Sequence, residues 1–210
     1  ITPDWVPFPR EVVLATGAIE RPLAFAGNDR PGIMLASAAH AFVGRWAVLS
    51  GRRVVVATNN DSAYRTAVAL RDAGAEVVLV DSRAAGAALD SGFEIVGNHI
   101  VRKATGRRTV CGAVIEDRLT GSQRHLPCDL LAVSGGWSPA VHLFSQSGGS
   151  LRFDERVQAF VPDRAVQSCR MVGAAAGDLD LGELEPLADL ADQGAAFVDL
   201  ANDVTVADIA

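Results

Sequence analysis

No apolar run in this sequence comes near the roughly 18 residues that a membrane-spanning helix needs. The first residues carry neither the basic stretch nor the apolar stretch of a secretory signal, so cytoplasm is the default expectation for location. Basic residues are sparse as well, since 19 Lys and Arg stand against 25 Asp and Glu, for a net charge of -6, and they form no cluster. This balance argues against nucleic acid and against an anionic membrane surface as partners.

Cysteine is also scarce. The sequence holds three, Cys111, Cys128 and Cys169, which are far apart and fall in no C-x-x-C or metal-ligand spacing. An odd, scattered set is typical of reduced and mostly buried thiols. The histidines are equally dispersed and indicate no metal site: His40, His99, His125 and His142. No nucleophile has a base at a readable spacing and no carboxylates pair in a motif, so we expect no catalytic residue in this chain.

The most informative stretch of the sequence runs from Arg53 to Ser82. Arg53–Ala57 predicts a strand, Asp61–Ala73 a helix that ends at Gly74, and Glu76–Val80 a second strand. Strand, tight turn, helix and strand in this order are typical of a dinucleotide-binding unit. At 210 residues, 49% of them hydrophobic, the chain is long enough to bury a core around it.

The turn of this unit departs from the fingerprint G-x-G-x-x-G/A, whose first two glycines make the turn and admit the pyrophosphate. The three fingerprint positions hold Thr58, Asn60 and Ala63. Only the third substitution is within the rule, and side chains at the other two would stand where a pyrophosphate approaches. We favour a structural interpretation, in which Asn59–Ser62, with Asp61 in its middle, caps the helix.

An acidic residue follows the second strand. Asp81 lies about 20 residues past the turn, where a carboxylate accepts a hydrogen bond from a ribose hydroxyl in an NAD site. The alternative is an aspartate that is solvated in a strand-end loop.

A second strand-end pattern lies upstream. The apolar run Val12–Leu14 predicts a buried parallel strand, which leads into Ala15, Thr16 and Gly17. A glycine at such a strand end lets backbone come close to a cofactor, although an ordinary strand-to-loop turn explains the same residues.

Apolar periodicity and turn residues predict the remaining elements. Helices are predicted at Ile33–Val43, capped by Asp29 or Ser37, and at Ala84–Leu89. Strands are predicted at Phe93–Val96, Asp129–Val133 and Cys169–Ala176. An antiparallel meander is predicted from Ile100–Lys103, Val110–Glu116 and Ser122–Leu126. The strand Asp129–Val133 runs into Gly135 and Gly136, which mark a close approach of backbone to a ligand or to another part of the protein. The predicted fold class is α/β, a Rossmann-like, doubly wound parallel sheet with a small antiparallel insert.

Several separated motifs resemble one family. They are Val13–Ala36, Thr58–Tyr64, Ser134–Trp137 and Phe197–Ile209. Together they resemble the alpha subunit of heterotetrameric sarcosine oxidase, within the two-dinucleotide superfamily of flavoprotein disulfide reductases. By this resemblance, residues 1–50 are the remnant of a first dinucleotide-binding domain and 51–133 a central, partial second domain of NAD(P)-binding type with the meander. Residues 134–196 then return to the first domain, and 197–210 begin a linker to an aminomethyltransferase-like region.

The resemblance implies an oxidoreductase complex that demethylates sarcosine to glycine and produces hydrogen peroxide. It implies NAD in the alpha subunit, FAD and FMN elsewhere in the complex, and beta, gamma and delta subunits as partners. Opine oxidase and hydrogen cyanide synthase subunits have similar middle regions and stay open as alternatives.

The resemblance also implies two groups of cofactor-binding residues. The first lines what remains of the first-domain crevice: Ala15, Thr16, Gly17, Gly135, Gly136, Gly173 and Ala174. At Gly173–Ala174, relatives usually have Gly-Asp, and Gly177–Asp178 is a weaker match for that pair. The second group is a degenerate second site: Thr58, Asn60, Asp61 and Asp81.

One family motif is missing. The family's first glycine-rich turn, expected before Val12–Leu14, is absent from these 210 residues. We therefore expect a middle fragment of a longer subunit, inactive alone, with weak or absent NAD binding and some tendency to self-associate. Two alternatives remain open, a scaffold module with decayed nucleotide sites and an active NAD(P)-dependent reductase.

Overall fold

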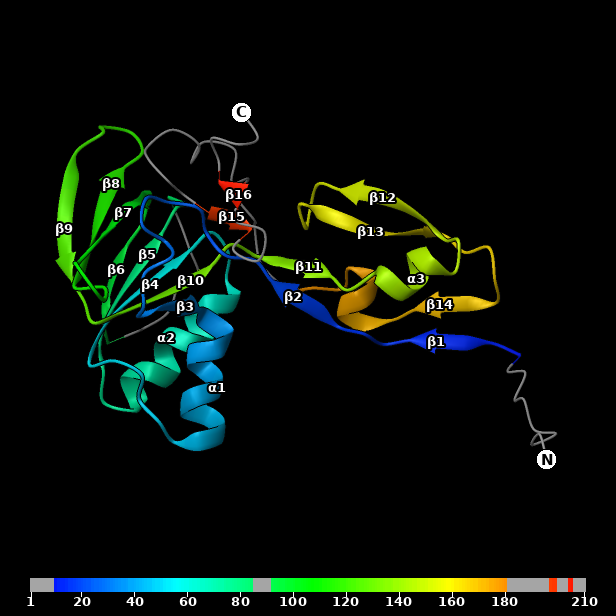
Figure 1. Cartoon of the computed structure of the whole chain (residues 1–210), viewed down its shortest axis with the longest axis horizontal. Helices are drawn as coiled ribbons and strands as arrows, with labels where there is room; N and C mark the ends of the chain where they lie inside the picture. Colours follow the sequence, from blue (N-terminus) through cyan, green and yellow to red (C-terminus); the bar gives the residue numbers. More distant parts are fainter. Residues whose placement is uncertain (1–9, 85–91, 181–196, 200–203, 206–210) are drawn as a thin grey trace. The chain divides into compact units, whose positions relative to one another are not determined.

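The computed structural model describes residues 10–84, 92–180, 197–199 and 204–205. The chain divides into two compact units (Figure 1). The small unit comprises Ile1–Ile19 and Trp137–Leu179, and the sheet unit comprises Glu20–Gly136 and Asp180–Ala210. No helix in the described part of the chain is long and apolar enough to cross a membrane.

A parallel sheet of five strands forms the centre of the sheet unit. Its order is β3 (Ile33–Leu35), β10 (Leu130–Ser134), β4 (Arg53–Thr58), β5 (Glu76–Asp81) and β6 (Glu94–Val96). Every neighbouring pair in it is parallel. The middle strands read as continuous apolar runs because layers of structure cover both faces, as in other parallel sheets. The predicted strands at 53–57, 76–80, 93–96 and 129–133 are therefore confirmed.

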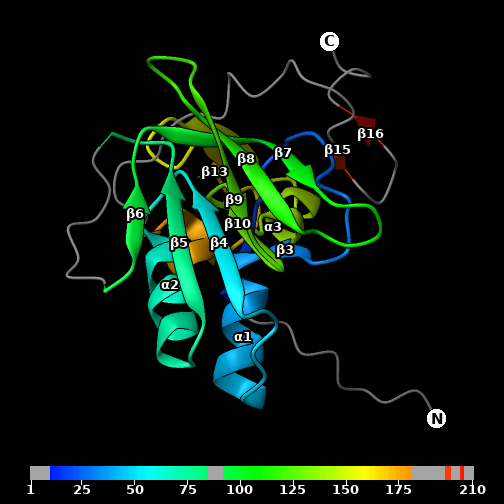
Figure 2. The ribbon, with the colours of Figure 1, turned by 90° about the vertical axis from the view of Figure 1, so that its left-hand side faces the viewer.

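Different layers cover the two faces of this sheet (Figure 2). On one face lie the helices α1 (Ala36–Trp46) and α2 (Ser62–Asp72), with Ala39, Ala67 and Leu70 buried against the strands. On the other lies the antiparallel meander of β7 (His99–Thr105), β8 (Gly112–Asp117) and β9 (Gln123–Pro127). The predicted α/β fold with an antiparallel insert is confirmed.

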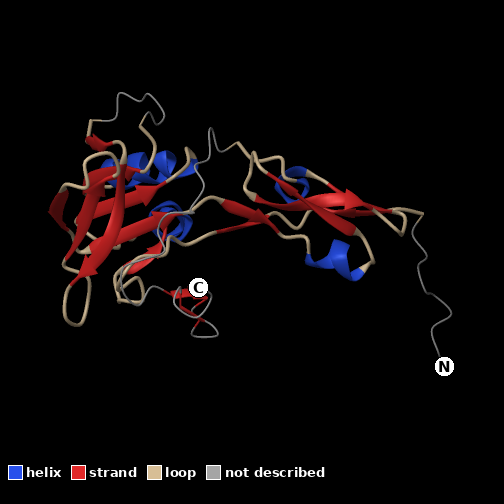
Figure 3. Cartoon of the chain, turned by 90° about the horizontal axis from the view of Figure 1, so that it is seen from above, coloured by secondary structure: helices blue, strands red, loops and turns tan. Residues whose placement is uncertain are grey.

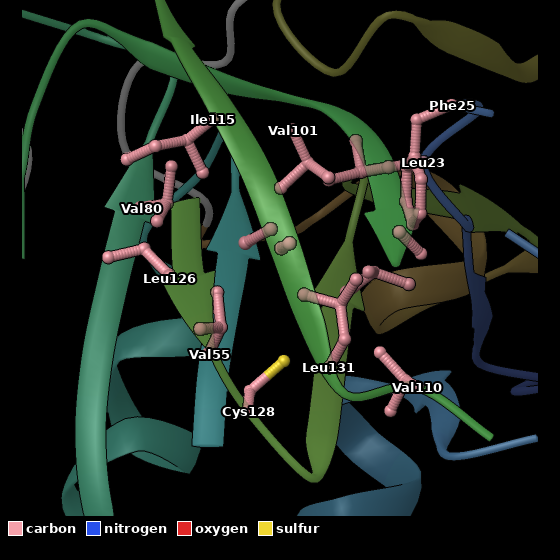
Figure 4. Close-up of a cluster of buried hydrophobic side chains, with 14 residues drawn as sticks. Leu23, Phe25, Val55, Val80, Val101, Val110, Ile115, Leu126, Cys128 and Leu131 are labelled. Carbon is pink, nitrogen blue, oxygen red and sulfur yellow. The ribbon is translucent and has the colours of Figure 1, made fainter. Parts of the chain in front are cut away.

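The space between the sheet and the meander is filled by apolar side chains (Figure 4). Val55 and Leu131 enter it from the sheet, and Ile115 and Leu126 enter it from the meander. Each of these four side chains is at most 3% exposed. Their burial holds the meander on the sheet through the hydrophobic effect.

The helix predicted at Ile33–Val43 is partly wrong. Its first three residues form β3, which pairs with β10, and the helix begins only at Ala36. No side chain at the N-cap makes a capping bond; instead the Glu20 carboxylate accepts a hydrogen bond from the backbone N–H of Ser37 at 2.8 Å. A partner 17 positions away caps the helix, so local sequence could not reveal it. The helix predicted at Ala84–Leu89 lies, beyond Ala84, outside the described residues.

The small unit consists largely of strands and loops (Figure 3). Its pairs are β1 (Val12–Leu14) with β14 (Cys169–Met171), β2 (Ala18–Glu20) with β11 (Trp137–Pro139), and β12 (Ser150–Asp154) with β13 (Ala159–Arg164). Its described residues also include two short helical segments, α3 (His142–Gln146) and the 3-10 turn η1 (Gly173–Ala176). Farther along the chain, β15 (Phe197–Asp199) pairs with β16 (Val204–Thr205).

Two predictions for the small unit need correction. Strand β1 is parallel to β14, as expected, but it is not buried, since Val12 and Val13 are 41% and 46% exposed. Their side chains point to opposite faces of a described sheet that has only two strands. The strand predicted at Cys169–Ala176 ends at Met171, because Gly173 takes a φ of 62° and starts a tight turn there.

The division into units does not follow the predicted boundary at residue 50. It falls at Ile19 and Glu20 instead. The reason is that β3 pairs with β10 and α1 packs beside α2, which ties residues 33–46 to the central sheet.

Candidate functional site

Polar side chains gather where three neighbouring strands of the sheet end. Thr58 of β4 lies in register with Asp81 of β5 on one side and with Ser134 of β10 on the other. In an open parallel sheet, a ligand binds at the carboxyl ends of the strands. The structure thus brings the four predicted second-site residues to the position that a dinucleotide would use.

The turn after β4 is closed by its own side chains. The Thr58 hydroxyl donates to the Asn60 carbonyl oxygen at 2.9 Å and accepts from the Asn60 backbone N–H at 3.1 Å. Neither residue needs a positive φ, so glycine is not required there for backbone freedom. The two side chains are buried, at the two turn positions that hold glycine in the fingerprint.

Asn60 caps α2 and also links β4 to β10. Its Oδ1 accepts from the backbone N–H of Ser62 at 3.0 Å, which satisfies one free donor at the helix start. Its Nδ2 donates to the carbonyl oxygen and the hydroxyl of Ser134, both at 3.3 Å. The predicted capping role of this segment is confirmed, with Asn60 as the capping side chain. Asp61 stands at the N-cap position without a side-chain capping bond.

Asp81 is neither solvated nor free to bind a ribose. Its carboxylate is fully buried and accepts the Tyr64 hydroxyl at 2.8 Å. Arg83 supplies three further donors, its backbone N–H at 2.9 Å, Nε at 3.0 Å and Nη2 at 2.7 Å. Arg83 Nη2 also reaches the Asp61 carboxylate at 2.6 Å. Four donors occupy the two oxygens of Asp81, which leaves no acceptor for a ribose hydroxyl.

The electrostatics of this network follow from burial and pairing. Burial raises the pKa of the Tyr64 hydroxyl far above its ordinary value, and the hydrogen bond to the Asp81 carboxylate raises it further. For Arg83, burial lowers the pKa, but the bonds to Asp81 and Asp61 outweigh burial and raise it overall. Tyr64 therefore keeps its phenolic proton and Arg83 its positive charge over the whole neutral range.

The Tyr64 hydroxyl provides a direct test. Tyr64 is the only tyrosine in the chain, so tyrosinate absorbance reports this group alone. The folded protein keeps the phenolic proton at pH values where the unfolded chain, with a pKa of about 10, loses it. We expect this group to leave the stability unchanged below about pH 10 and to lower it above, by at most about 1.4 kcal/mol per pH unit.

An alkaline titration followed by absorbance checks this expectation. The native protein should give no tyrosinate signal until it unfolds, whereas the protein in urea should titrate near pH 10. The Tyr64→Phe variant should lose this part of the alkaline destabilisation. A tyrosinate step near pH 10 in protein that is still folded would contradict the buried hydrogen bond.

The candidates of the first crevice lie in a more open setting. Strands β1 and β14 are parallel and end with Leu14 beside Met171, so Ala15 and Gly173 follow the ends of two neighbouring strands. Gly17 has a φ of 75°, and an added Cβ at Gly17 or at Gly173 would meet no atom within 4 Å. The Thr16 hydroxyl is used internally, since it donates to the Ala140 carbonyl oxygen at 2.7 Å. Ala15, Gly173 and the neighbouring Ala174 carry no charged group.

Gly135 and Gly136 belong to the sheet unit and approach protein backbone. A Cβ at Gly135 would lie 2.7 Å from the carbonyl oxygen of Pro22. The Gly135 N–H donates to the Arg21 carbonyl oxygen, and the Gly136 carbonyl oxygen accepts from the Arg21 N–H, both at 2.8 Å. These contacts are with another part of the protein, and the predicted approach of Gly135 and Gly136 to a cofactor stays a prediction.

Arg83 and Tyr64 were not among the predicted site residues. Arg83 follows Asp81 by two positions, a spacing that lets a long side chain fold back onto a carboxylate. The burial of this pair, which decides its role, depends on the packed layers. Among the described residues no group of three His, Cys, Asp or Glu side chains is arranged to hold a metal ion.

Comparison with known proteins finds relatives of this chain by sequence. No family model matches the chain. A sarcosine oxidase alpha subunit from Corynebacterium sp. (strain P-1) is 42% identical over 181 residues, and the one from Rhizobium meliloti (strain 1021) is 36% identical over 173. Each match covers 81% of this chain. The chain is homologous to sarcosine oxidase alpha subunits over most of its length. It spans only 19% and 17% of the length of these two relatives.

Solved structures agree on the fold of this sarcosine oxidase alpha-subunit homologue. Thioredoxin reductase from T. acidophilum superposes with a TM-score of 0.63 and 17% identity, over 79% of this chain and 57% of that one. L-proline dehydrogenase from P. horikoshii gives 0.60 and 24% identity, over 79% of this chain and 30% of that one. The fold is the two-dinucleotide-binding fold of these solved structures.

Proposed function

We propose that this chain is a nucleotide-domain region of the alpha subunit of a sarcosine-oxidase-type complex. The complex would demethylate sarcosine oxidatively to glycine and release hydrogen peroxide, with NAD in the alpha subunit and FAD and FMN elsewhere. Its partners would be beta, gamma and delta subunits. The identity to sarcosine oxidase alpha subunits supports this proposal.

Within that complex, the crevice at the ends of β4, β5 and β10 would be a scaffold and not a nucleotide site. The observation that carries this proposal is the saturated carboxylate of Asp81, which is fully buried and bound by Tyr64 and Arg83. Opening it to a ribose would break an ion pair in a buried setting, and ligand binding would have to supply that free energy. Thr58 and Asn60 would block the pyrophosphate position in the same way.

Any NAD association would then involve the open strand ends of the small unit. Ala15, Thr16 and Gly17, with Gly173 and Ala174 beside them, are the residues proposed to face it. Backbone that is open at Gly17 and Gly173 suits a ligand that approaches closely. The same proposal expects the chain alone to bind nucleotide weakly and to be inactive.

Calorimetric titration of the chain with NAD, NADP and FAD tests these assignments. We expect dissociation constants above about 10 µM, a standard free energy weaker than about -7 kcal/mol. Tighter binding that is lost in Asp81→Asn would overturn the scaffold role of the second crevice. Tighter binding that survives Asp81→Asn and is weakened by Gly17→Ala would instead assign the ligand to the small unit and contradict the expected weakness of the chain alone.

The catalytic part of the proposal requires the assembled complex. Full-length alpha subunit, produced with its partner subunits, should consume oxygen and form hydrogen peroxide when sarcosine is added. An assembled complex that oxidises an opine and leaves sarcosine unchanged would replace the proposed substrate.

A further inference from the structure

Two cysteines lie opposite each other where the meander meets the sheet. The register of β8 and β9 ends with Gly112 facing Pro127, so Cys111 and Cys128 are the first residues beyond the ladder. The Cys128 N–H donates to the Cys111 carbonyl oxygen at 3.2 Å, which holds the two backbones together there. Antiparallel neighbours that are joined by backbone hydrogen bonds have Cα atoms about 5.5 Å apart. Disulfides bridge Cα atoms about 4.4 to 6.8 Å apart, so the backbone spacing suits a disulfide.

The two thiols are free, and their surroundings differ. Cys111 is exposed, whereas Cys128 is 1% exposed and points into the apolar cluster between the meander and the sheet (Figure 4). Burial, with a smaller contribution from the Asp129 carboxylate, raises the pKa of the Cys128 thiol to about 12. A dissolved oxidant therefore meets Cys111 first, and Cys128 is placed to react with the product from inside.

A hydroxyl and an imidazole adjoin the exposed thiol. Thr105 Oγ1 lies 3.7 Å from Cys111 Sγ and 3.0 Å from His125 Nε2. This chain of contacts offers the thiol proton a path to the imidazole, and the thiolate is the nucleophilic form of cysteine. Gly112 leaves room for the ring, because a Cβ there would lie 2.4 Å from His125 Nε2.

We propose that Cys111 and Cys128 form a peroxide-responsive dithiol pair, with Thr105 and His125 as positioning residues that accept the proton of Cys111. The Cys111 thiolate attacks one oxygen of hydrogen peroxide, the O–O bond breaks, and a sulfenic acid and hydroxide result. Cys111 then turns about its Cα–Cβ bond, and the Cys128 sulfur attacks the sulfenic sulfur and displaces hydroxide. The hydroxide ions take up the two thiol protons, so two thiols and one peroxide give one disulfide and two waters. That the complex itself supplies the peroxide rests on the proposed function; the dithiol pair does not.

Peroxide added to the purified chain tests the pair. Peptide mapping without reductant should find Cys111 linked to Cys128, with the loss of two hydrogen atoms. Cys111→Ser should abolish the link, and the matched control Cys169→Ser should leave it intact. Cys111 oxidised beyond sulfenic acid with Cys128 still a free thiol would overturn the proposal, as would a link from either one to Cys169.

The rate of sulfenic acid formation tests the proton path from Cys111 through Thr105 to His125. Thr105→Val should slow sulfenic acid formation at Cys111 by about tenfold or more, because the thiol loses the hydroxyl that passes its proton to His125. Thr105→Ser, which keeps the hydroxyl, should restore the rate. Equal rates in the two variants would remove Thr105 and His125 from the proposal.

A final experiment tests the dithiol pair independently of the proposed function. In the assembled complex, the disulfide should form during amine turnover, and catalase should prevent it. If added peroxide forms the disulfide while turnover does not, the dithiol pair stands and the complex is not its source of peroxide.

Discussion

Replacing Arg83 with alanine is expected to lower the free energy of unfolding by about 3 to 5 kcal/mol, the cost of leaving a buried charge without its partner. The Asp81 carboxylate would keep the Tyr64 hydroxyl and one backbone N–H but lose both guanidinium donors. Asp81 is fully buried in the native packing, so its carboxylate would stand there without a charged partner. Urea denaturation followed by circular dichroism measures the change.

Two further variants make this prediction specific. Arg124 forms an ion pair with Glu94 in which both side chains are about half exposed, so Arg124→Ala should cost less than about 1 kcal/mol. The double variant Arg83→Ala with Asp81→Asn should recover part of the loss, since the unpaired charge is gone. A cost for Arg83→Ala as small as that for Arg124→Ala would mean that the buried pair does not hold the crevice closed.

The sequence identified the central unit because its signals are local. The strand at Arg53–Ala57, the helix at Asp61–Ala73 and the strand at Glu76–Val80 each show their own period within a few residues, and short turns join them. The meander was predictable for the same reason. Its strands are neighbours in sequence as well as in space.

Long-range pairing set the features that the sequence did not reveal. Ile33–Leu35 continues the helical spacing of the residues after it, yet it forms a strand because β10, almost 100 residues later, offers a parallel neighbour. Glu20 caps α1, and Arg83 binds the Asp81 carboxylate at the ends of the sheet strands. Each is a charged residue, and only packing determined that it would be buried.

The sequence predicted where the candidate site lies, but it did not predict the burial and hydrogen bonding of its side chains. Thr58 and Asn60 stood out because they replace expected glycines, and both lie at the strand ends as expected. Asp81 was expected either to bind a ribose or to meet solvent, and it does not meet solvent because Tyr64 from α2 and Arg83 enclose it. No spacing rule specifies that a tyrosine 17 positions earlier points at this carboxylate.

Replacing Asn60 with alanine is expected to lower the free energy of unfolding by about 2 to 4 kcal/mol. Losing the bond to the Ser62 N–H removes a helix cap, which costs about 1 kcal/mol. Losing the donor to Ser134 leaves a fully buried hydroxyl and carbonyl without this partner, which costs a further 1 to 3 kcal/mol or so. Ser62→Ala is the matched control, because it keeps the capped N–H and should cost less than about 1 kcal/mol.

The same residues decide whether a glycine turn alone would restore a nucleotide site. In a variant with glycine at Thr58 and Asn60, the pyrophosphate position would be open, but Asp81 would still be bound by Arg83 and Tyr64. We therefore expect calorimetry to find lower stability and no gain in NAD affinity. A gain of tenfold or more, about 1.4 kcal/mol, would mean that the side chains of the turn close the crevice and that the Asp81 network does not.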